Sequence, residues 1–484
     1  MRISRPIHLL AALALVAMGA VASPAGAAVR PPTWSAMSYL PGVPAGSSAV
    51  SQAACTAPGN CVVAGVYPTD NPRTLFVSTE VRGHWGAPRV VVTGYPRTTV
   101  GALSCPDAHD CVVVGSYQSA NQMSMYGFIA SETNGRWGAP QLVTLPGVAP
   151  ATMSVAGLTA ACASAGNCVV GGGNVSGGAA WVESESGGIW GSPDVLGNSV
   201  GSGPSAAEYA SCGRVGDCTV TGVDGADGYN GIFAVTYSNG QWGAVTQIAN
   251  VVNSVTTGNG EAAAVNAISC VGVGYCVIGG DYPVDRAPLT IYFQQPFVAV
   301  EYNGTWGAAQ PVPGVLAVNK GGVGSTTYVR CWTVDQCVIA GFYGDGTFYR
   351  PWEERSQGAR WGGIIEPQRQ GGNASYGLPV GFGCASPAVC AQIGAPGNRA
   401  QVGIVNGRLP VSMGVVAGGY SWGGRWTPVR YLGAWTLGYR GWAYVNTVAC
   451  SPTGIYCLVA GGRNTTASGA PPFRSQRAFV IVFS

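Results

Sequence analysis

The sequence predicts an all-β protein made of eight copies of one short unit, and three observations lead to this prediction. The 16 cysteines form eight close pairs along the chain. A segment containing Gly followed by Trp comes after almost every pair. Glycine is abundant, with 75 residues, and so are aromatic residues, at 10% of the chain. Many glycines together with many aromatic residues suit short strands that are joined by tight turns.

Each cysteine pair is predicted to form a disulfide across a β-hairpin. Turn-forming residues separate the two cysteines, as in TAPGN and PDAHD, and a β-rich run follows the second, as in CVVAGVY. Facing positions on paired strands bring Cβ atoms close enough for a disulfide. Zinc is the alternative, but zinc sites favour shorter cysteine spacings and the chain has three histidines. The pairs are Cys55 and Cys61, Cys105 and Cys111, Cys162 and Cys168, Cys212 and Cys218, Cys270 and Cys276, Cys331 and Cys337, Cys384 and Cys390, and Cys450 and Cys457.

The Gly-Trp segment completes each unit. An apolar strand such as TLFVSTEV (74–81) precedes a Gly-containing turn, and Trp then opens the next strand, as in VRGHWGAP and TNGRWGAP. Each unit is therefore predicted as strand, Cys-bridged turn, strand, loop, strand, turn and Trp strand. The first cysteines of successive units are 50 to 66 residues apart. Four short strands in a repeat of this length are typical of a β-propeller blade.

The two ends of the chain predict how the repeats close on themselves. The last cysteine pair is followed by one strand, RAFVIVFS (477–484), and by no Trp segment. The segment PPTWSAMSYLPG (31–42) has a Trp strand at Trp34 but no cysteine pair before it. We expect this strand to complete the last unit, which closes a single eight-bladed β-propeller with one local disulfide per blade and covers its edges. Seven blades is the alternative, if one degenerate copy is not a blade.

The first 27 residues are predicted to be a secretory signal peptide. Arg2 and Arg5 precede an apolar run over 7–22, and small residues at 25–27 form a cleavage site. The run is shorter than the roughly 20 apolar residues that a membrane span needs. We therefore expect a secreted, extracellular chain without a membrane span, whose propeller domain covers 28–484. We also expect it to be a monomer.

The repeat resembles a known group of proteins. The C-x5-C pair, the CVVVG-type strand and the N-G-x-W turn are similar to the SCPS…CVAVG…NGxxW repeats of exported actinobacterial propeller proteins, over nearly all of 28–484. The turn also resembles, more distantly, the Asp-box and kelch turns of sialidase-like and galactose-oxidase-like propellers, although the acidic residue of the Asp-box is replaced or displaced here. The resemblance implies export and a propeller fold. Because the group has no settled activity, it implies none for this chain.

Charge and histidine content exclude some classes of function. The formal net charge is +3, 9% of residues are charged, and two of the positive charges belong to the signal peptide. A nucleic-acid-binding protein normally shows a basic stripe, so we expect no nucleic-acid partner. His84 and His109 are the histidines outside the signal peptide. Copper chemistry on a propeller needs several His and Tyr ligands, so we expect no metal and no cofactor.

Candidate binding residues lie where the copies differ. The residue before the first cysteine is small in most copies but is Arg330 in the sixth, and Glu208 lies near the same strand of the fourth. The segments DYPVDRAP and FYGDGTFYRPW mix aromatic, acidic and arginine residues, which suits carbohydrate or peptide recognition by loops on a rigid scaffold. The alternative is ordinary loop and surface variation. The candidates are Asp281, Tyr282, Asp285, Arg286, Arg330, Tyr343, Asp345 and Arg350.

We expect a binding module for a glycan, a peptide or a protein, with no catalytic residues. The alternative is a glycan-active enzyme, either sialidase-like or lyase-like. Two convergent carboxyl groups with a shifted pKa, together with an arginine cluster, would favour the enzyme. Aromatic and amide groups between the second and third strands, without such a pair, would favour binding.

Overall fold

The computed structural model describes residues 32–44, 46–68, 72–120, 124–149, 154–174, 178–196, 205–224, 231–251, 263–284, 293–320, 322–346, 349–358, 360–366, 376–396, 416–422, 425–426, 430–432, 443–464 and 476–484. The predicted signal peptide lies outside these residues. Thr33–Ser484 forms one compact unit, and its described elements are strands and one short helix, α1 (Val315–Val318). The predicted all-β fold is confirmed. No helix in the described ranges is long and apolar enough to cross a membrane.

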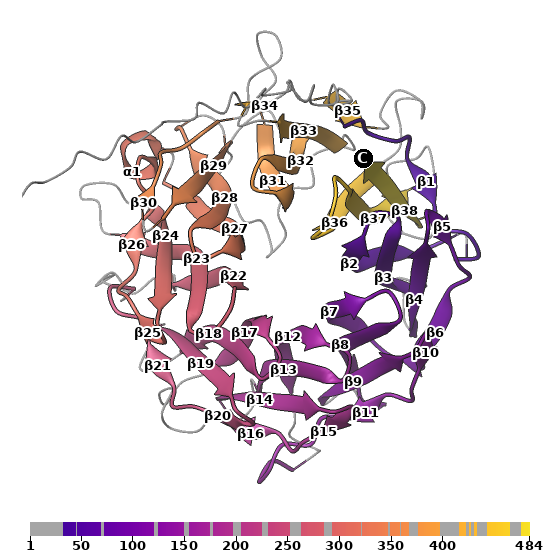
Figure 1. Cartoon of the computed structure of the whole chain (residues 1–484). Helices are drawn as coiled ribbons and strands as arrows, with labels where there is room; N and C mark the ends of the chain where they lie inside the picture. Colours follow the sequence, from indigo (N-terminus) through magenta and orange to yellow (C-terminus); the bar gives the residue numbers. More distant parts are fainter. Residues whose placement is uncertain are drawn as a thin grey trace, which may run out of the picture. The chain divides into compact units, whose positions relative to one another are not determined.

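The described strands form eight successive units, numbered here 1 to 8 along the chain (Figure 1). Unit 1 contains β2 (Ala49–Ala57), β3 (Asn60–Tyr67), β4 (Arg73–Val81), β5 (His84–Trp85) and β6 (Arg89–Tyr95). Unit 2 contains β7 (Thr99–Asp107), β8 (Asp110–Gln118), β9 (Met125–Thr133), β10 (Arg136–Trp137) and β11 (Gln141–Leu142). Unit 3 contains β12 (Val155–Ser164), β13 (Asn167–Asn174), β14 (Ala179–Ser186), β15 (Ile189–Trp190) and β16 (Asp194–Val195). Unit 4 contains β17 (Ala206–Arg214), β18 (Asp217–Asp224), β19 (Gly231–Ser238), β20 (Gln241–Trp242) and β21 (Thr246–Gln247).

The second half of the chain repeats this pattern. Unit 5 contains β22 (Ala264–Cys270), β23 (Tyr275–Val284), β24 (Phe293–Tyr302), β25 (Thr305–Trp306) and β26 (Gln310–Pro311). Unit 6 contains β27 (Gly324–Thr333), β28 (Gln336–Gly344), β29 (Tyr349–Gln357) and β30 (Arg360–Trp361). Unit 7 contains β31 (Tyr376–Ser386), β32 (Val389–Pro396), β33 (Val416–Trp422), β34 (Arg425–Trp426) and β35 (Arg430–Leu432). Unit 8 contains β36 (Ala443–Cys450), β37 (Cys457–Asn464), β38 (Gln476–Phe483) and β1 (Ser38–Tyr39).

Consecutive strands of a unit pair antiparallel in chain order, as the repeat predicts. In unit 1, β2 pairs with β3, β3 with β4 and β4 with β5. Cys55 and Cys61 face each other on the first two strands, and all eight predicted disulfides are formed. The Trp strand is shorter than expected: β5 contains two residues and ends at Trp85. Pro88, which has no N–H to donate, follows shortly after, and β6 then resumes the pairing with β4.

A glycine in the second strand lets an aromatic ring of the third strand lie across it. A Cβ on Gly65 would lie 2.2 Å from the carbonyl oxygen of Ala49 and 2.8 Å from the ring of Phe76. Phe76 has no exposed surface. The glycine of the CVVAG motif is therefore part of the core packing, since no side chain fits there.

Apolar faces of neighbouring units pack against each other to form the core. Phe76 of unit 1 packs in one cluster with Leu458 and Val480 of unit 8. On the other face of unit 1, Leu75 packs in a cluster with Phe128 of unit 2. Each unit thus buries both faces of its sheet, which explains the near-continuous apolar runs of the second strands.

The first strands of successive units contact one another along the chain, from β2 to β7, β12, β17, β22, β27, β31 and β36. The last of them, β36, contacts β2. The N-terminal segment pairs with the last strand, because Ser38 lies opposite Val480 and Tyr39 opposite Phe479. Trp34 bridges to Phe483 in the same strand. Unit 8 therefore takes its fourth strand from the other end of the chain (Figure 1).

Candidate functional site

Every first strand carries a β-bulge near its start, and two of these bulges place polar side chains of the candidate site. The bulge in β22 lies at Asn266, and the bulge in β17 lies at Glu208. A bulge turns a side chain away from the regular alternation of a strand. These two side chains are therefore aimed differently from their neighbours on the same strands.

Asn266 joins two neighbouring units through a small polar network. Its Nδ2 donates to Oδ1 of Asp281 at 2.7 Å and to the Ser325 hydroxyl at 2.8 Å. Asp281 lies on β23 of the same unit, and Ser325 lies on β27 of the next. Burial raises the pKa of Asp281 to about 6, although hydrogen bonds from Ser325 and Asn266 oppose this. The network holds a carboxyl group that titrates in mildly acidic solution.

A second carboxyl group, that of Glu208, lies on β17 of unit 4, next to Tyr209 in the chain. Burial raises the pKa of Glu208 to about 7. The pKa of Tyr209 is raised to about 12, first by burial and then by the charges of Glu208 and Asp281. Both carboxyl groups are thus close enough to Tyr209 to influence its hydroxyl. Of the features that would favour an enzyme, the two carboxyl groups show the shifted pKa.

Tyr282 lies beside an amide side chain that the sequence did not single out. Tyr282 is half-buried, and its ring centroid is 6.2 Å from that of Phe297. Its partner across the strands is Gln295, which is 1% exposed. Neither polar atom of the Gln295 amide has a hydrogen-bond partner within the described residues, and Oδ1 of Asn319 also lacks one. Buried polar groups are normally paired, so the unpaired amide of Gln295 stands out among the described residues.

Three other candidates form a closed cluster at the end of β28. Nε of Arg350 donates to Oδ2 of Asp345 at 2.5 Å, and the Tyr343 hydroxyl donates to Oε1 of Glu366. Tyr343 and Arg350 are partners across β28 and β29. Burial, followed by the hydrogen bond and charge of Glu366, raises the pKa of Tyr343 strongly. The charges of Arg350 and Asp345 neutralise each other, so this pair stabilises the hairpin end beside β27.

The remaining candidates do not join this region. Arg330 pairs with Val338 on β27, whereas Ser325 pairs with Phe342 on the same two strands. Five strand residues separate Arg330 from Ser325, which corresponds to roughly 16 Å. The Arg330 guanidinium instead lies 6.0 Å from the ring centroid of Trp332. Asp285 and Arg286 lie outside the described residues.

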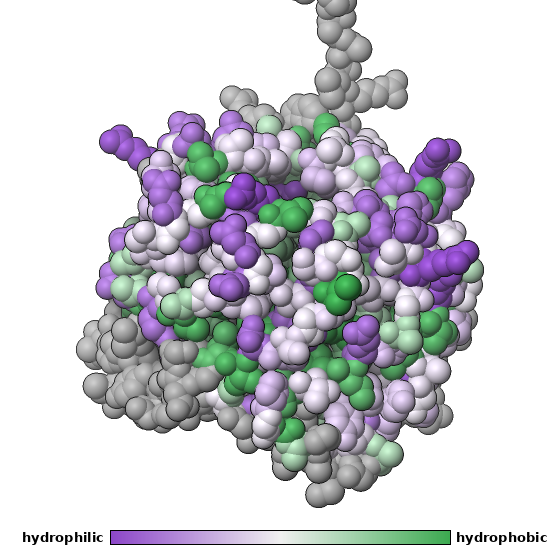
Figure 2. Space-filling view, turned by 60° about the horizontal axis from the view of Figure 1, so that its bottom comes forward, coloured by the Kyte–Doolittle hydropathy of each residue, from purple (hydrophilic) through white to green (hydrophobic). Residues whose placement is uncertain are grey.

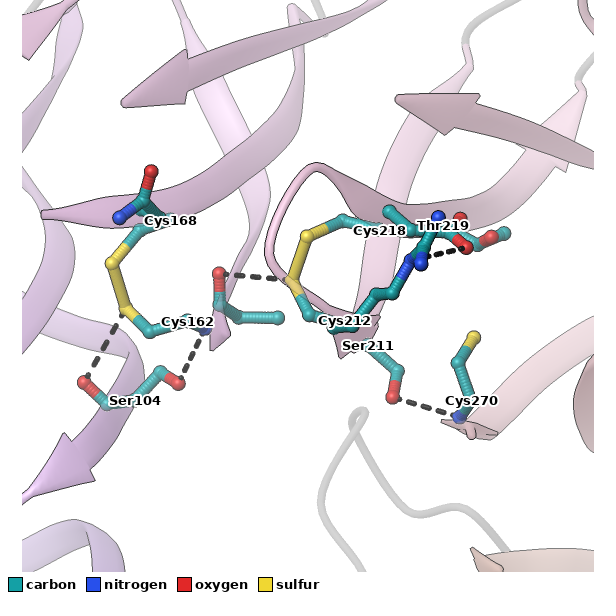
Figure 3. Close-up of a disulfide and its surroundings, with 12 residues drawn as sticks. Ser104, Cys162, Cys168, Ser211, Cys212, Cys218, Thr219 and Cys270 are labelled. Atoms are coloured by element: carbon teal, nitrogen blue, oxygen red, sulfur yellow. Dashed lines mark hydrogen bonds and ion pairs between the residues drawn. A yellow bond between two sulfur atoms is a disulfide. The ribbon is translucent and has the colours of Figure 1, made fainter. Parts of the chain in front are cut away.

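The position before the first cysteine has a structural role in several units (Figure 3). The Ser104 hydroxyl accepts a hydrogen bond from the backbone N–H of Cys162 in the next unit, at 2.9 Å. Ser211 accepts the corresponding bond from Cys270, also at 2.9 Å. In unit 6, where Arg330 replaces the serine, the hydroxyl of Tyr328 accepts this bond from the N–H of Cys384. The unit with the unusual arginine therefore keeps the inter-unit bond through another residue.

A surface hollow of about 520 Å³ lies along the Trp strand of unit 1. Its lining includes Trp85, Arg89, Glu132 and the two histidines, His84 and His109. Both histidines are exposed, as expected. Burial raises the pKa of Glu132 to about 7. No group of three or more metal-ligating side chains gathers anywhere in the described parts of the chain. On the face drawn in Figure 2, hydrophobic and hydrophilic residues are interspersed.

Comparisons with known proteins give no family assignment. No family model matches the chain, and no curated protein matches it. Among solved structures, a polysaccharide lyase PL25 ulvan lyase is similar at 12% identity, over 76% of this chain and 89% of that one, with a TM-score of 0.42. Sqt1 of Chaetomium thermophilum is similar at 11% identity, over 90% and 95%, with a TM-score of 0.46. The GH93 α-L-arabinofuranosidase of Fusarium graminearum is similar at 9% identity, over 75% and 93%, with a TM-score of 0.38. At this level of similarity, these structures assign no function.

Proposed function

We propose that the protein is an exported, eight-bladed β-propeller that binds a hydroxyl-rich ligand, such as a glycan, at units 4 to 6. Each unit is one blade, and the pairing of β1 with β38 closes the ring. The contacts of β36 with both β31 and β2 support this closure. Eight disulfides support export, because disulfides persist in oxidising compartments.

The unpaired amide of Gln295 is the observation that carries the binding proposal. It places one donor group and one acceptor next to the half-buried ring of Tyr282. Because the amide is 1% exposed, a ligand reaches it only when neighbouring side chains move aside. Sugars present hydroxyl groups that both donate and accept, together with C–H faces that pack on aromatic rings. Few, well-placed polar groups beside an aromatic surface are typical of ligand sites. Asp281 precedes Tyr282 on the same strand, so its side chain points to the opposite face, where it contacts Asn266 and Ser325.

A binding screen on the secreted chain tests the proposal. The screen presents a panel of neutral and charged glycans, and any ligand found is then titrated against Tyr282→Ala. We expect this variant to lose at least about tenfold in affinity, because the aromatic surface of the site is removed. Tyr302→Ala is the matched control, since Tyr302 lies at the other end of the same third strand and is 63% exposed. Equal losses in both variants, or no binding to any glycan of the panel, would contradict the proposal.

A glycan-active enzyme is the second candidate, and the carboxyl groups of Glu208 and Asp281 favour it. Both have raised pKa values, to about 7 and about 6, so one group can hold a proton while the other is ionised near neutral pH. The arginine cluster that sialidase-like chemistry requires is not formed by the described candidates, because Arg350 pairs with Asp345. The test is whether the chain cleaves a bound glycan and releases products. Cleavage that is lost in Glu208→Gln would replace the binding proposal with this one.

A further inference from the structure

The near-neutral overall charge conceals an uneven distribution along the chain. All 21 acidic residues lie at or before Glu366, whereas nine arginines lie after it. Residues 367–484 therefore carry a formal charge of +9 with no acidic residue, and this stretch supplies all of unit 7 and three strands of unit 8. The arginines are Arg369, Arg399, Arg408, Arg425, Arg430, Arg440, Arg463, Arg474 and Arg477.

Two of these arginines are held together on unit 8 by an aromatic ring from the N-terminal strand. Arg463 and Arg477 are direct partners across β37 and β38. Nη1 of Arg463 donates to the Tyr39 hydroxyl at 2.7 Å. The Arg477 guanidinium carbon lies 4.1 Å from the centroid of the Tyr39 ring. Tyr39 thus fixes both guanidinium groups, one through its hydroxyl and one through its ring face.

Among the residues that the structure describes, neither guanidinium group has a carboxylate partner. The ion pairs among the described residues involve Arg214, Arg350 and Arg355, and none involves Arg463 or Arg477. Nε of Arg463 is buried and has no hydrogen-bond partner in that part of the chain. Burial lowers the pKa of Arg463. Like charges placed directly opposite each other on neighbouring strands are unfavourable unless an anion relieves them.

We infer that unit 8 carries a binding site for an anionic polysaccharide, with Arg463 and Arg477 as its paired anion contacts. Guanidinium groups donate two parallel hydrogen bonds to carboxylate or sulfate groups, and Tyr39 holds these two in advance of binding. Arg477 covers one face of the Tyr39 ring, and the ring also packs against the buried cluster that contains Val459 and Ile481, so it offers little surface on which a nucleic-acid base could stack. The site therefore selects negative charge on an extended chain of sugars.

A second copy of this chain is a poorer partner. Of its 17 acidic residues in the described ranges, ten are buried, so few described carboxylates remain to meet the basic stretch. The inferred site is also separate from Gln295, which lies on unit 5. A variant that loses binding at one site can therefore still be tested for binding at the other site. The two proposals can fail independently.

The affinity of the secreted chain for a size-defined heparin oligosaccharide tests this inference. The measurement is made in low salt and at about 0.15 M salt, because an ionic contact weakens as salt screens it. We expect Arg463→Gln and Arg477→Gln each to weaken binding several-fold, and the double variant by more than about tenfold. Tyr39→Phe keeps the ring over Arg477 but removes the hydrogen bond to Arg463, and we expect an intermediate loss. Thermal unfolding of each variant establishes that unit 8 remains folded.

Arg360→Gln is the matched control, since it removes the same charge from an exposed arginine of unit 6. We expect its heparin affinity to stay within about twofold of the parent chain. The inference is overturned if the folded double variant binds heparin as the parent does, or if Arg360→Gln weakens binding equally. It is also overturned if single-stranded DNA binds more tightly than heparin and depends on the same two arginines.

Discussion

Single residues decide how closely the strands of a unit approach one another. In unit 2, a Cβ on Gly115 would lie 2.3 Å from the carbonyl oxygen of Thr99 and 2.5 Å from Cζ of Phe128. Phe128 is completely buried, so its ring has no room to retreat. The aromatic ring of Phe128 therefore fills the space that a side chain at Gly115 would otherwise occupy.

Gly115→Ala is expected to lower the free energy of unfolding by about 2–4 kcal/mol, because the added methyl group overlaps a backbone oxygen and a fixed ring. Gly138→Ala is the control in the same unit. A Cβ at Gly138 lies 3.5 Å from the carbonyl oxygen of Ser131, which is an ordinary contact. Chemical denaturation measures both variants. Equal stability of the two variants would show that Gly115 is not required by packing.

At the scale of strands and hairpins, the sequence predicts what is encoded locally. Two cysteines separated by a short turn determine a bridged hairpin, and all eight form. The Trp strand is expected to be longer than it is, because its pairing with the third strand breaks after Trp85 and resumes at β6. The inter-unit bonds of Ser104 and Ser211 are not predictable from the repeat, since their donors are cysteines in the following unit.

For the candidate site too, the sequence predicts residues that stand out locally and misses those whose contacts depend on the register between strands. Asp281 and Tyr282 are recognisable because they interrupt the repeat, and they do lie together on β23. Gln295 is missed because its pairing with Tyr282 depends on the register across a loop. A polar residue at an apolar position of the third strand is the signal that could have found it. Arg330 was grouped with Asp281 by composition, although the length of β27 keeps them apart.

At the scale of the whole molecule, the packing of one unit on the next buries many carboxyl groups. Ten of the 21 acidic residues are buried. Glu183, Glu301 and Glu354 lie on third strands, and burial raises the pKa of each to about 7. For Glu301, the charge of Asp217 adds to this effect. The folded state therefore holds protons that the unfolded chain releases.

This proton binding predicts a protein that is more stable in mild acid than in mild base. Between about pH 4.5 and 7 the folded state binds more protons than the unfolded state, so the free energy of unfolding falls as the pH rises through this window. We expect the Tm to be several degrees higher at pH 5 than at pH 8. Glu354→Gln should raise the Tm at pH 8 and change it little at pH 5. A Tm that rises between pH 5 and pH 8 would contradict this prediction.

The central claim is that the regular parts of the repeat are scaffold, and that a ligand binds at units 4 to 6 where the copies differ. Gln295→Met tests it most directly, because methionine fills a similar volume without hydrogen-bonding groups. An unpaired buried amide costs about 1–3 kcal/mol, so its removal should leave the Tm unchanged or raise it. With a ligand from the glycan screen, the same variant should lose at least about tenfold in affinity. A lowered Tm with unchanged affinity would show that Gln295 serves the scaffold, and it would contradict the account.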